Sequence, residues 1–268
     1  MLAVQRRSKI LAELNNGGSV KVSDLVAILG VSDMTVRRDL TVLQRHGLLE
    51  KVHGGAVVRT EPSTAEPGFE AKSARRLAEK EAIALRAASM VAPGSAIAVS
   101  AGTTTHLFAR HLVGIPGLTV VTNSFWVADV LHRGAADSVS VLLTGGLRTP
   151  SDALVGPIAV AALASLHLDA VFMGVHGMDS RAGFSTPNLL EAETNRAMCR
   201  SARRLIVLAD STKWGVVGLS SMADLSDASV VITDTGLPAQ ASAILGEQAE
   251  ALVLVDPVGA PPEVAGRT

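Results

Sequence analysis

VSDMTVRRDL, residues 31–40, predicts a helix whose two sides differ in chemistry. Gly30 permits a tight turn just before this stretch. Ser32 is a good N-cap, because its hydroxyl can accept a hydrogen bond from an amide of the first helical turn. The helix is expected to continue to about residue 46 and to stop at Gly47. The stretch therefore defines one complete helix, and the chain on both sides is interpreted relative to it.

Apolar residues occupy one side of this helix, because Val36, Leu40 and Leu43 are spaced i, i+4 and i+7. At about 100° per residue, the other side presents Met34, Arg38, Thr41 and Arg45, with Thr35 and Arg37 on the flanks. Arginine can bond guanine edges or phosphates, and threonine can bond a phosphate or contact a thymine methyl group. This helix suits the major groove of DNA, although an ordinary solvated helix face has the same composition.

The flanking segments favour the DNA interpretation. A first helix is expected over residues 3–15, and a second, capped by Ser23, over residues 24–29 with Leu25, Ile28 and Leu29 facing inward. Two helices joined at Gly30 form a helix-turn-helix, in which the second helix contacts DNA. Residues 48–58 are β-prone around a Gly-Gly pair and predict a β-ribbon, or wing. His53 at its tip either contacts a phosphate or the minor groove, or is a turn residue.

Composition and charge separate a small basic part from a large acidic one. The chain has 268 residues, of which 48 % are hydrophobic, enough for a sizeable core. Residues 1–60 contain nine Lys and Arg against five Asp and Glu, whereas the remainder contains fifteen against twenty. This asymmetry suits a head that meets an anionic polymer. The single cysteine, Cys199, excludes an intramolecular disulfide, and we expect it to be a buried small hydrophobe.

The chain also predicts its division into domains. A polar segment with Pro62 and Pro67 predicts a linker over residues 59–78, and Phe69 to Lys80 is expected to be one charged helix. The predicted domains are a head at 1–58, an α/β domain at 79–256 and a disordered tail at 257–268. No apolar run of membrane-spanning length and no signal peptide is present, so a cytoplasmic protein is expected.

Seven short apolar runs alternate with helical segments in the larger domain. This alternation predicts a mostly parallel sheet covered on both faces, in an α/β fold. The expected strands are 95–99, 118–121, 139–143, 169–173, 205–209, 230–233 and 252–255. The expected helices are 79–90, 104–112, 125–132, 157–165, 187–202 and 238–246.

Polar, glycine-containing loops follow several of these strands, at the edge where such sheets bind ligands. The loop at 101–105 (AGTTT) opens a helix, and its free amides and hydroxyls suit a phosphate. Further loops are TNS at 122–124, TGG at 144–146 and DSTK at 210–213, in which Lys213 could neutralise a phosphate or a carboxylate. Loops of this kind are also ordinary turns, but their convergence on one edge supports a small oxygen-rich anion.

A resemblance to a known family rests on runs from both parts of the chain. VS at 31–32, TVRRDL at 35–40 and HGGA at 53–56 closely resemble the DNA-binding head of DeoR-type bacterial transcriptional regulators. AGTTT, TNS, TGG, DAVFMGVHGM, GFST and DSTK resemble the effector domain of the same family. The resemblance implies a winged helix-turn-helix head and an α/β domain related to sugar-phosphate isomerases, which senses a phosphorylated sugar or a related metabolite.

The predicted site residues follow from the pattern and this resemblance together. The predicted DNA contacts are Ser32, Thr35, Arg37, Arg38, Thr41, Arg45 and His53, among which the resemblance favours Thr35, Arg37 and Arg38. Asp39 is expected to pair with a neighbouring arginine, since phosphates would repel a carboxylate that faces them. The effector site implied by the resemblance comprises Gly102, Thr103, Thr104, Thr105, Asn123, Ser124, Gly145, Gly146 and Lys213, with Glu191 at the rim.

Two further residues are predicted near this effector site. The family commonly has Asp where this chain has Ser100, and a neutral serine there suggests a different or more weakly bound effector. His176 lies in a loop near the expected pocket and either bonds the ligand or occupies a turn.

The leading interpretation is a transcriptional repressor of carbohydrate genes, with a DNA operator, a phosphorylated effector and a second copy of the chain as partners. A sugar-phosphate isomerase or transferase with a fused DNA-binding head is the alternative, and a pure oligomerisation module is a third. The sequence contains no Walker loop, GxGxxG, HExxH or compact acid/base motif, so neither a cofactor nor a metal is expected, and no catalytic residue is proposed.

Overall fold

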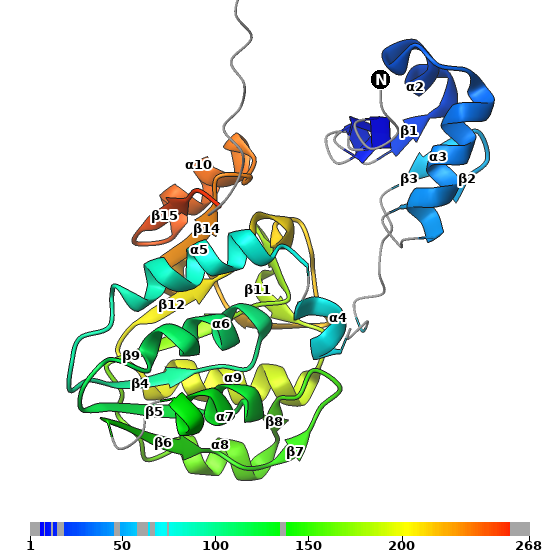
Figure 1. Ribbon diagram of the computed structural model, residues 1–268. Coiled ribbons are helices and arrows are strands. Elements are labelled where there is room, and N and C mark those ends of the chain that lie inside the picture. Colours follow the sequence, from blue (N-terminus) through cyan, green and yellow to red (C-terminus); the bar gives the residue numbers. More distant parts are fainter. Residues whose placement is uncertain are drawn as a thin grey trace, which may run out of the picture. The chain divides into compact units, whose positions relative to one another are not determined.

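The computed structural model describes residues 6–7, 9–11, 13–14, 19–45, 49–57, 64, 68–73, 75–134 and 138–257. The chain divides into two compact units, Met1–Pro62 and Ser63–Thr268. We call them the head and the body and describe each by itself (Figure 1). The predicted linker at 59–78 falls largely within the body, where it contains two helical segments. The predicted tail at 257–268 lies outside the described residues except for Pro257.

The head is a helix-turn-helix beside a small antiparallel sheet. Helices α2 (Val22–Leu29) and α3 (Asp33–Arg45) are joined through Gly30, whose φ of 63° is left-handed. Strands β1 (Ser19–Lys21), β2 (Glu50–Val52) and β3 (Gly55–Val57) form a sheet in the order β1-β3-β2. The apolar stripe of α3 is buried as predicted, and it packs in one core with Leu25, Ile10 and Ala56.

Several local predictions in the head differ from the structure. Helix α2 begins at Val22 rather than after Ser23, and the hydroxyl of Ser23 bonds Asp24 instead of capping the helix. Ile28 is exposed, because Val22 and Leu29 take the inward positions of this short helix. The first predicted helix, 3–15, lies partly outside the described residues, and those that are described within it are helical.

The wing (residues 50–57) is a hairpin with a two-residue turn, His53-Gly54. Gly54 has a φ of 80°, which favours glycine. Gly55 lies so close to β1 that a Cβ atom built on it would be 2.1 Å from the carbonyl oxygen of Val20. Each glycine of the pair therefore has its own role, one in the turn and the other in strand packing.

The body is built on a seven-stranded parallel sheet in the order β15-β14-β12-β9-β4-β5-β6. All six pairings are parallel, and every strand lies where a strand was predicted. The strands are β4 (Ala96–Val99), β5 (Leu118–Thr122), β6 (Val139–Leu143), β9 (Ala170–Gly174), β12 (Leu205–Leu208), β14 (Ala228–Asp234) and β15 (Leu252–Val255). The chain builds outward from β4 to β5 and β6, and then returns to the other side of β4 with β9.

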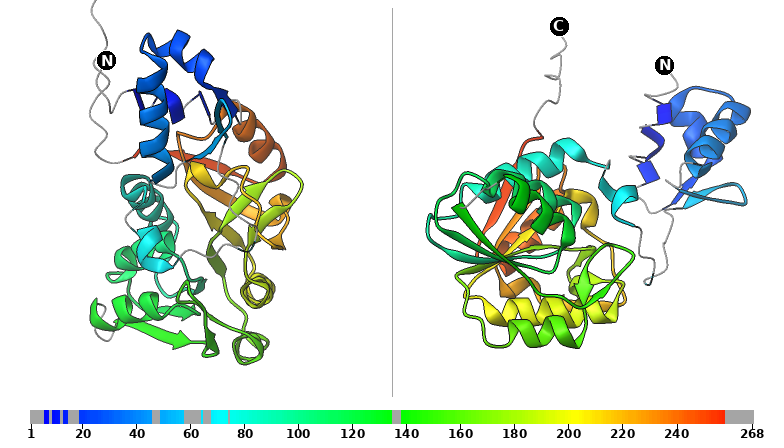
Figure 2. Two further views of the ribbon diagram at one scale, coloured as in Figure 1. Left: turned by 90° about the vertical axis from the view of Figure 1, so that its right-hand side faces the viewer. Right: turned by 60° about the horizontal axis from the view of Figure 1, so that its bottom comes forward.

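Helices cover both faces of this sheet, which gives the three layers visible in Figure 2. Alternate strand residues, such as Ile97 and Ala98, enter two different cores. On one face lie α5 (Leu77–Ala88), α6 (Thr103–Leu112) and α7 (Phe125–Gly134). On the other lie α8 (Pro157–Leu163), α9 (Leu189–Ser201) and α10 (Ala239–Gln248).

Three features of the body were not predicted. A small antiparallel sheet contains β10 (Gly177–Asp179), β11 (Gly183–Thr186) and β13 (Ser220–Ala223), and β7 (Leu147–Arg148) pairs with β8 (Leu154–Val155). The predicted helix from Phe69 to Lys80 is two helices, α4 (Phe69–Ser73) and α5, because Arg76 between them is left-handed with a φ of 54°. These short elements carry too few residues to show a periodic pattern.

Candidate functional site

The N-terminus of α3 carries a hydroxyl pair. Ser32 and Thr35 lie 2.9 Å apart through their side-chain oxygens, and the amide of Thr35 donates to the Ser32 hydroxyl at 3.3 Å. Ser32 therefore caps the helix as predicted. The Ser32 hydroxyl is exposed beside helical amides, an arrangement that suits a phosphate.

The two adjacent arginines of α3 differ in their surroundings. Arg37 forms an ion pair with Asp33 at 2.5 Å, and this hydrogen bond and charge raise the pKa of Arg37. Arg38 is exposed and forms no ion pair with any residue that the structure describes. Met34, on the same side of the helix, is 81 % exposed, so it does not pack within the head. The exposed face of α3 thus presents Arg37, which is paired with Asp33, and Arg38, which has no ion pair among the described residues. The apolar side chain of Met34 lies on the same face.

Thr41 connects α3 to the wing. Its hydroxyl donates to the carbonyl of Arg37 at 2.8 Å and accepts from Lys51 on β2 at 2.9 Å. A DNA contact by Thr41 would compete with this bond to Lys51. His53 is exposed at the hairpin tip, and the side chain of Arg45 lies outside the described residues.

Asp39 lies on the inner side of α3 and is 4 % exposed. Its carboxylate pairs with Arg6 at 2.5 Å and lies 3.7 Å from Arg7. The prediction that Asp39 is a structural partner of an arginine is confirmed. This buried pair ties the N-terminal residues to α3 across 33 positions of sequence.

The body contains a pocket at the carboxyl ends of three neighbouring strands, β4, β9 and β12. The order in which successive strands are added to the sheet reverses between β4 and β9, and such switch points are where open α/β sheets bind ligands. Six predicted effector residues line this pocket: Gly102, Thr103, Thr104, His176, Glu191 and Lys213. The N-terminus of α6 opens there, so its free amides favour an anion.

The other six predicted effector residues do not line the pocket, and they hold its surroundings instead. Ser100 is fully buried, with its hydroxyl accepting from the Gly174 amide at 3.0 Å, and Thr105 donates to the Gly102 carbonyl at 3.0 Å. The expectation that Ser100 tunes the effector directly is therefore not supported by its position. Its hydroxyl instead joins the loops after β4 and β9.

The loops after β5 and β6 lie beside the pocket, because these strands are one and two positions away from β4. The Asn123 side chain accepts from the Ala101 amide at 2.8 Å and donates to Leu154, while Ser124 caps α7 by accepting from the Val127 amide. The remaining two predicted residues, Gly145 and Gly146, pack near Ile158 and Val155. A Cβ atom on Gly146 would be 2.5 Å from the Val155 carbonyl oxygen, so this glycine permits the β7–β8 hairpin.

The sequence analysis missed Lys72, Lys80 and Thr186, which also line the pocket. A usable signal was present, because residues 63–268 contain only three lysines, Lys72, Lys80 and Lys213. All three line the same pocket, although they come from α4, α5 and the loop after β12. Because the body has no other lysine, these three residues could have been selected from the sequence as candidates for one anion site.

Electrostatics and burial both mark the lysine cluster as unusual. Burial lowers the pKa of Lys80 to about 8, although the charge of Asp210 opposes this. Three further cations lower it as well, namely Lys213, Lys72 and Arg75. The buried hydroxyl of Thr186 makes no hydrogen bond within the described residues. Buried polar groups normally have a partner, so a ligand oxygen is a natural candidate here.

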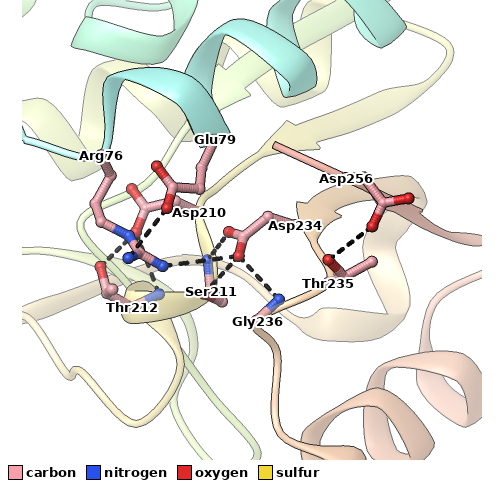
Figure 3. A network of polar contacts seen from close by, with 9 residues as sticks. All are labelled: Arg76, Glu79, Asp210, Ser211, Thr212, Asp234, Thr235, Gly236 and Asp256. Atoms are coloured by element: carbon pink, nitrogen blue, oxygen red, sulfur yellow. Dashed lines mark hydrogen bonds and ion pairs between the residues drawn. The ribbon is translucent and has the colours of Figure 1, made fainter. Parts of the chain in front are cut away.

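Two carboxylates near the pocket accept hydrogen bonds from neighbouring residues of the body. Asp210 caps the short helix η2 (Ser211–Lys213) and accepts from the amide and hydroxyl of Thr212. Asp234, which is 1 % exposed, accepts from the amide and the hydroxyl of Ser211 at 2.6 and 2.9 Å, as Figure 3 shows. Glu191 is the one carboxylate among the lining residues that the structure describes.

Neither a metal site nor a reactive cysteine is found among the residues that the structure describes. No group of three or more His, Cys, Asp or Glu side chains is placed to hold a metal there. Cys199 is only half-buried, but burial still raises the pKa of its thiol to about 11, so little nucleophilic thiolate forms at neutral pH. No helix among the described residues is long and apolar enough to cross a membrane.

Sequence comparisons match both units. The family model described as DeoR-like helix-turn-helix domain matches residues 6–61, and the one described as DeoR C terminal sensor domain matches residues 75–235. A protein of Escherichia coli O157:H7, named for transcriptional repression of the aga operon, is 37 % identical over 94 % of this chain and 93 % of its own. The lactose phosphotransferase system repressor of Streptococcus mutans is 33 % identical over 86 % of this chain and 91 % of its own.

Further comparisons extend over sequence and structure. The transcriptional regulator GlpR of Haloferax volcanii is 35 % identical over 89 % of this chain and 92 % of its own. Among solved structures, ribose 5-phosphate isomerase A of Methanocaldococcus jannaschii is similar, with a TM-score of 0.38 and 16 % identity. That match covers 50 % of this chain and 53 % of the isomerase.

Proposed function

The chain belongs to the DeoR family of DNA-binding transcriptional regulators, and from this we propose that a phosphorylated sugar in the body pocket controls how tightly the head binds an operator. The observation that carries the proposal is the pocket at the β4/β9 switch point, where the N-terminus of α6 meets the body's three lysines. Helix amides and ammonium groups together favour a phosphate. Glu191 and Thr186 supply oxygen atoms for the hydroxyl groups of a sugar.

The head would bind DNA through the exposed face of α3. We assign base or phosphate contacts to Arg38 and Arg37, a phosphate contact to the Ser32–Thr35 end, and a thymine-methyl contact to Met34. His53 in the wing would contact the backbone or the minor groove. Thr41 is placed as a tie to Lys51 that orients the wing, since both of its bonds lie within the head.

Repression of carbohydrate genes is the regulatory output that we favour. Relatives are named as repressors of the aga operon and of the lactose phosphotransferase system, and the pocket suits a phosphorylated carbohydrate. A homo-oligomer would present two copies of α3 to the half-sites of an operator, as helix-turn-helix dimers do. Action on a bacterial operator would place the protein in the cytoplasm.

We further propose that the body senses its ligand without turning it over. A sugar-phosphate isomerase needs a general base and an acid beside the substrate. Among the described residues, Glu191 is the one carboxylate that lines the pocket, and Asp210 accepts from Thr212. The alternative, an isomerase or transferase with a fused head, predicts turnover of pentose or hexosamine phosphates by the purified chain. We expect none.

A mobility-shift assay with the full chain tests the regulatory proposal. DNA fragments selected by the protein from a random pool would serve as operators, and a panel of sugar phosphates would be added at increasing concentration. We expect at least one sugar phosphate to change operator affinity by about 5–150-fold, the usual range of allosteric coupling. An unphosphorylated panel is the matched control. DNA binding that no sugar phosphate alters would contradict the sensing role while leaving the DNA-binding role intact.

A further inference from the structure

The short helix α4 contributes to the pocket although it lies at the start of the body. Its Lys72 lines the pocket together with Lys80 of α5 and Lys213 of η2. Because α4 begins at Phe69, it is the first helix of the body after the segment that leads from the head. A ligand contact on α4 would thus lie only a few residues from the connection to the DNA-binding unit.

The contacts that the structure describes for α4 lie at both of its ends. A helix of five residues is too short to be stable alone, so its position depends on its neighbours. Phe69 stacks on Trp126, with ring centroids 5.3 Å apart, and lies edge-on to His106 at 5.5 Å. At the other end, the Lys80 ammonium donates to the Lys72 carbonyl at 2.6 Å.

The joint between α4 and α5 is fixed independently of α4. Arg76 adopts a left-handed conformation that a residue with a side chain seldom adopts, and it pairs with Glu79 at 3.0 Å and with Asp234 at 3.8 Å. Figure 3 shows that Asp234 also holds Ser211, the first residue of η2. One network therefore anchors the start of α5 and the short helix that carries Lys213. Lys80 and Lys213 are thus carried by elements that this network holds, whereas Lys72 is carried by α4.

The three lysines carry like charges into one pocket, and Glu191 is the carboxylate among its described lining residues. Lys80 also experiences Asp210, Lys213, Lys72 and Arg75. Like charges held this close are unfavourable until an anion joins them. An anion with two negative charges would convert repulsion between α4 and the anchored lysines into attraction to a shared group.

We propose that α4 is a ligand-responsive strap, in which the phosphate of the effector is bound between Lys72 on α4 and Lys80 and Lys213 on the anchored body. The inference rests on the proposed function and adds Lys72 as a binding residue and α4 as the element whose position the ligand sets. Phe69 is a positioning residue that orients the strap through Trp126. Phosphate binding would fix α4, and with it the start of the chain segment that leads to the head.

Hydrogen exchange and calorimetry on the full chain, with inorganic phosphate as the probe, test this strap. In the wild type we expect phosphate to slow amide exchange of residues 69–73 at least about tenfold, because bound states protect locally opened segments. Lys72→Met should bind phosphate about tenfold more weakly, the loss of one charge-assisted contact. It should also lose the protection of residues 69–73. Arg133→Met is the matched control, because it removes an exposed cation from α7, where Arg133 pairs with Asp129.

A second variant separates positioning from charge. Phe69→Ala keeps all three lysines but removes the stack on Trp126, so α4 amides should exchange faster without phosphate. Operator affinity without effector should stay within about threefold of the wild type, while the effect of an active sugar phosphate on it should fall at least about fivefold. Phosphate binding without protection of residues 69–73 would overturn the strap alone. Failure of the wild type to bind phosphate or any sugar phosphate would overturn the proposed sensing function together with the strap.

Discussion

The head and the body place their candidate functional residues in opposite ways. In the head, most of the side chains predicted to contact DNA lie on one exposed helix face, and ten residues of sequence contain most of them. In the body, the pocket residues come from α4, α5 and the loops after β4, β9 and β12, and the lysine most deeply inserted, Lys80, is 4 % exposed. Residues that share one helix face can be recognised from their spacing in the sequence. Residues that meet at the ends of several strands can be recognised only when the order of the strands in the sheet is known.

This comparison predicts the largest effect at the two arginines of α3. Arg37→Ala with Arg38→Ala should reduce operator affinity at least about 100-fold, since a hydrogen bond to a charged group contributes about 1.5–3 kcal/mol. A quantitative mobility shift measures this loss, and Arg133→Ala in the body is the control. Arg38→Ala alone should cost more than Arg37→Ala, because Arg37 is already engaged by Asp33. Near-wild-type affinity in the double variant would remove both residues from the interface.

Stability of the head should depend on one buried carboxylate rather than on an exposed one. Asp39→Asn leaves Arg6 without its charged partner and should lower the head's free energy of unfolding by about 3–5 kcal/mol. The matched control is Asp33→Asn on the same helix, whose exposed pair should contribute less than about 1 kcal/mol. Native-state hydrogen exchange of residues 22–45 distinguishes the head from the body. Equal losses in the two variants would contradict the structural role of Asp39.

The stability of the body should change with pH above about pH 8, because of Lys80. The pKa of Lys80 is lowered to about 8 from 10.5, so the folded body binds fewer protons than the unfolded chain between these values. The cost of burying the charge is therefore present below about pH 8, and it is relieved as the pH rises towards 10.5.

Phosphate binding should follow the opposite trend. Because a phosphate favours the charged ammonium, its affinity should fall by about tenfold per pH unit above pH 8, while the unliganded body becomes more stable. Calorimetry between pH 7 and 9.5 and urea denaturation over the same range test the two trends. Lys80→Met, which cannot titrate, should bind phosphate weakly with no such slope. A slope that persists in this variant would assign the proton to another group.

The smallest effect is expected at Ser100. The sequence predicts it as an effector residue, but it does not line the pocket. Ser100→Ala should change sugar-phosphate affinity less than about threefold and cost about 1 kcal/mol of stability, the usual contribution of one hydrogen bond. Thr186→Val is the informative partner, because it replaces a buried hydroxyl that lines the pocket. Weaker binding in Ser100→Ala than in Thr186→Val would reverse this assignment.

Local pattern was sufficient to predict α3, its buried stripe and the seven strands of the sheet. Each of these elements has a hydrophobic period or a continuous apolar run. The same pattern could not separate Thr103 and Thr104, which line the pocket, from Asn123 and Gly145, which lie beside it. All follow strands, and the difference arises because β5 and β6 lie to one side of β4 while β9 and β12 lie to the other.

Short and charged segments were the hardest to predict. The break at Arg76 depends on Asp234, which lies more than 150 residues later, so no local signal announces it. Lys72 and Lys80 looked like cations on a solvated helix because neighbouring residues carry the same charges. Only the fold reveals that one of them is buried, and the scarcity of other lysines in the body is the one clue that the sequence offered.

That scarcity distinguishes the pocket chemically from the rest of the body. Any reagent that acylates primary amines can modify the body only at Lys72, Lys80 or Lys213, all within one pocket. Modification of the body would therefore remove positive charge from the ligand site itself, and an occupied pocket would shield the same three amines. Mass-spectrometric footprinting could thus record ligand occupancy directly from the mass of one domain.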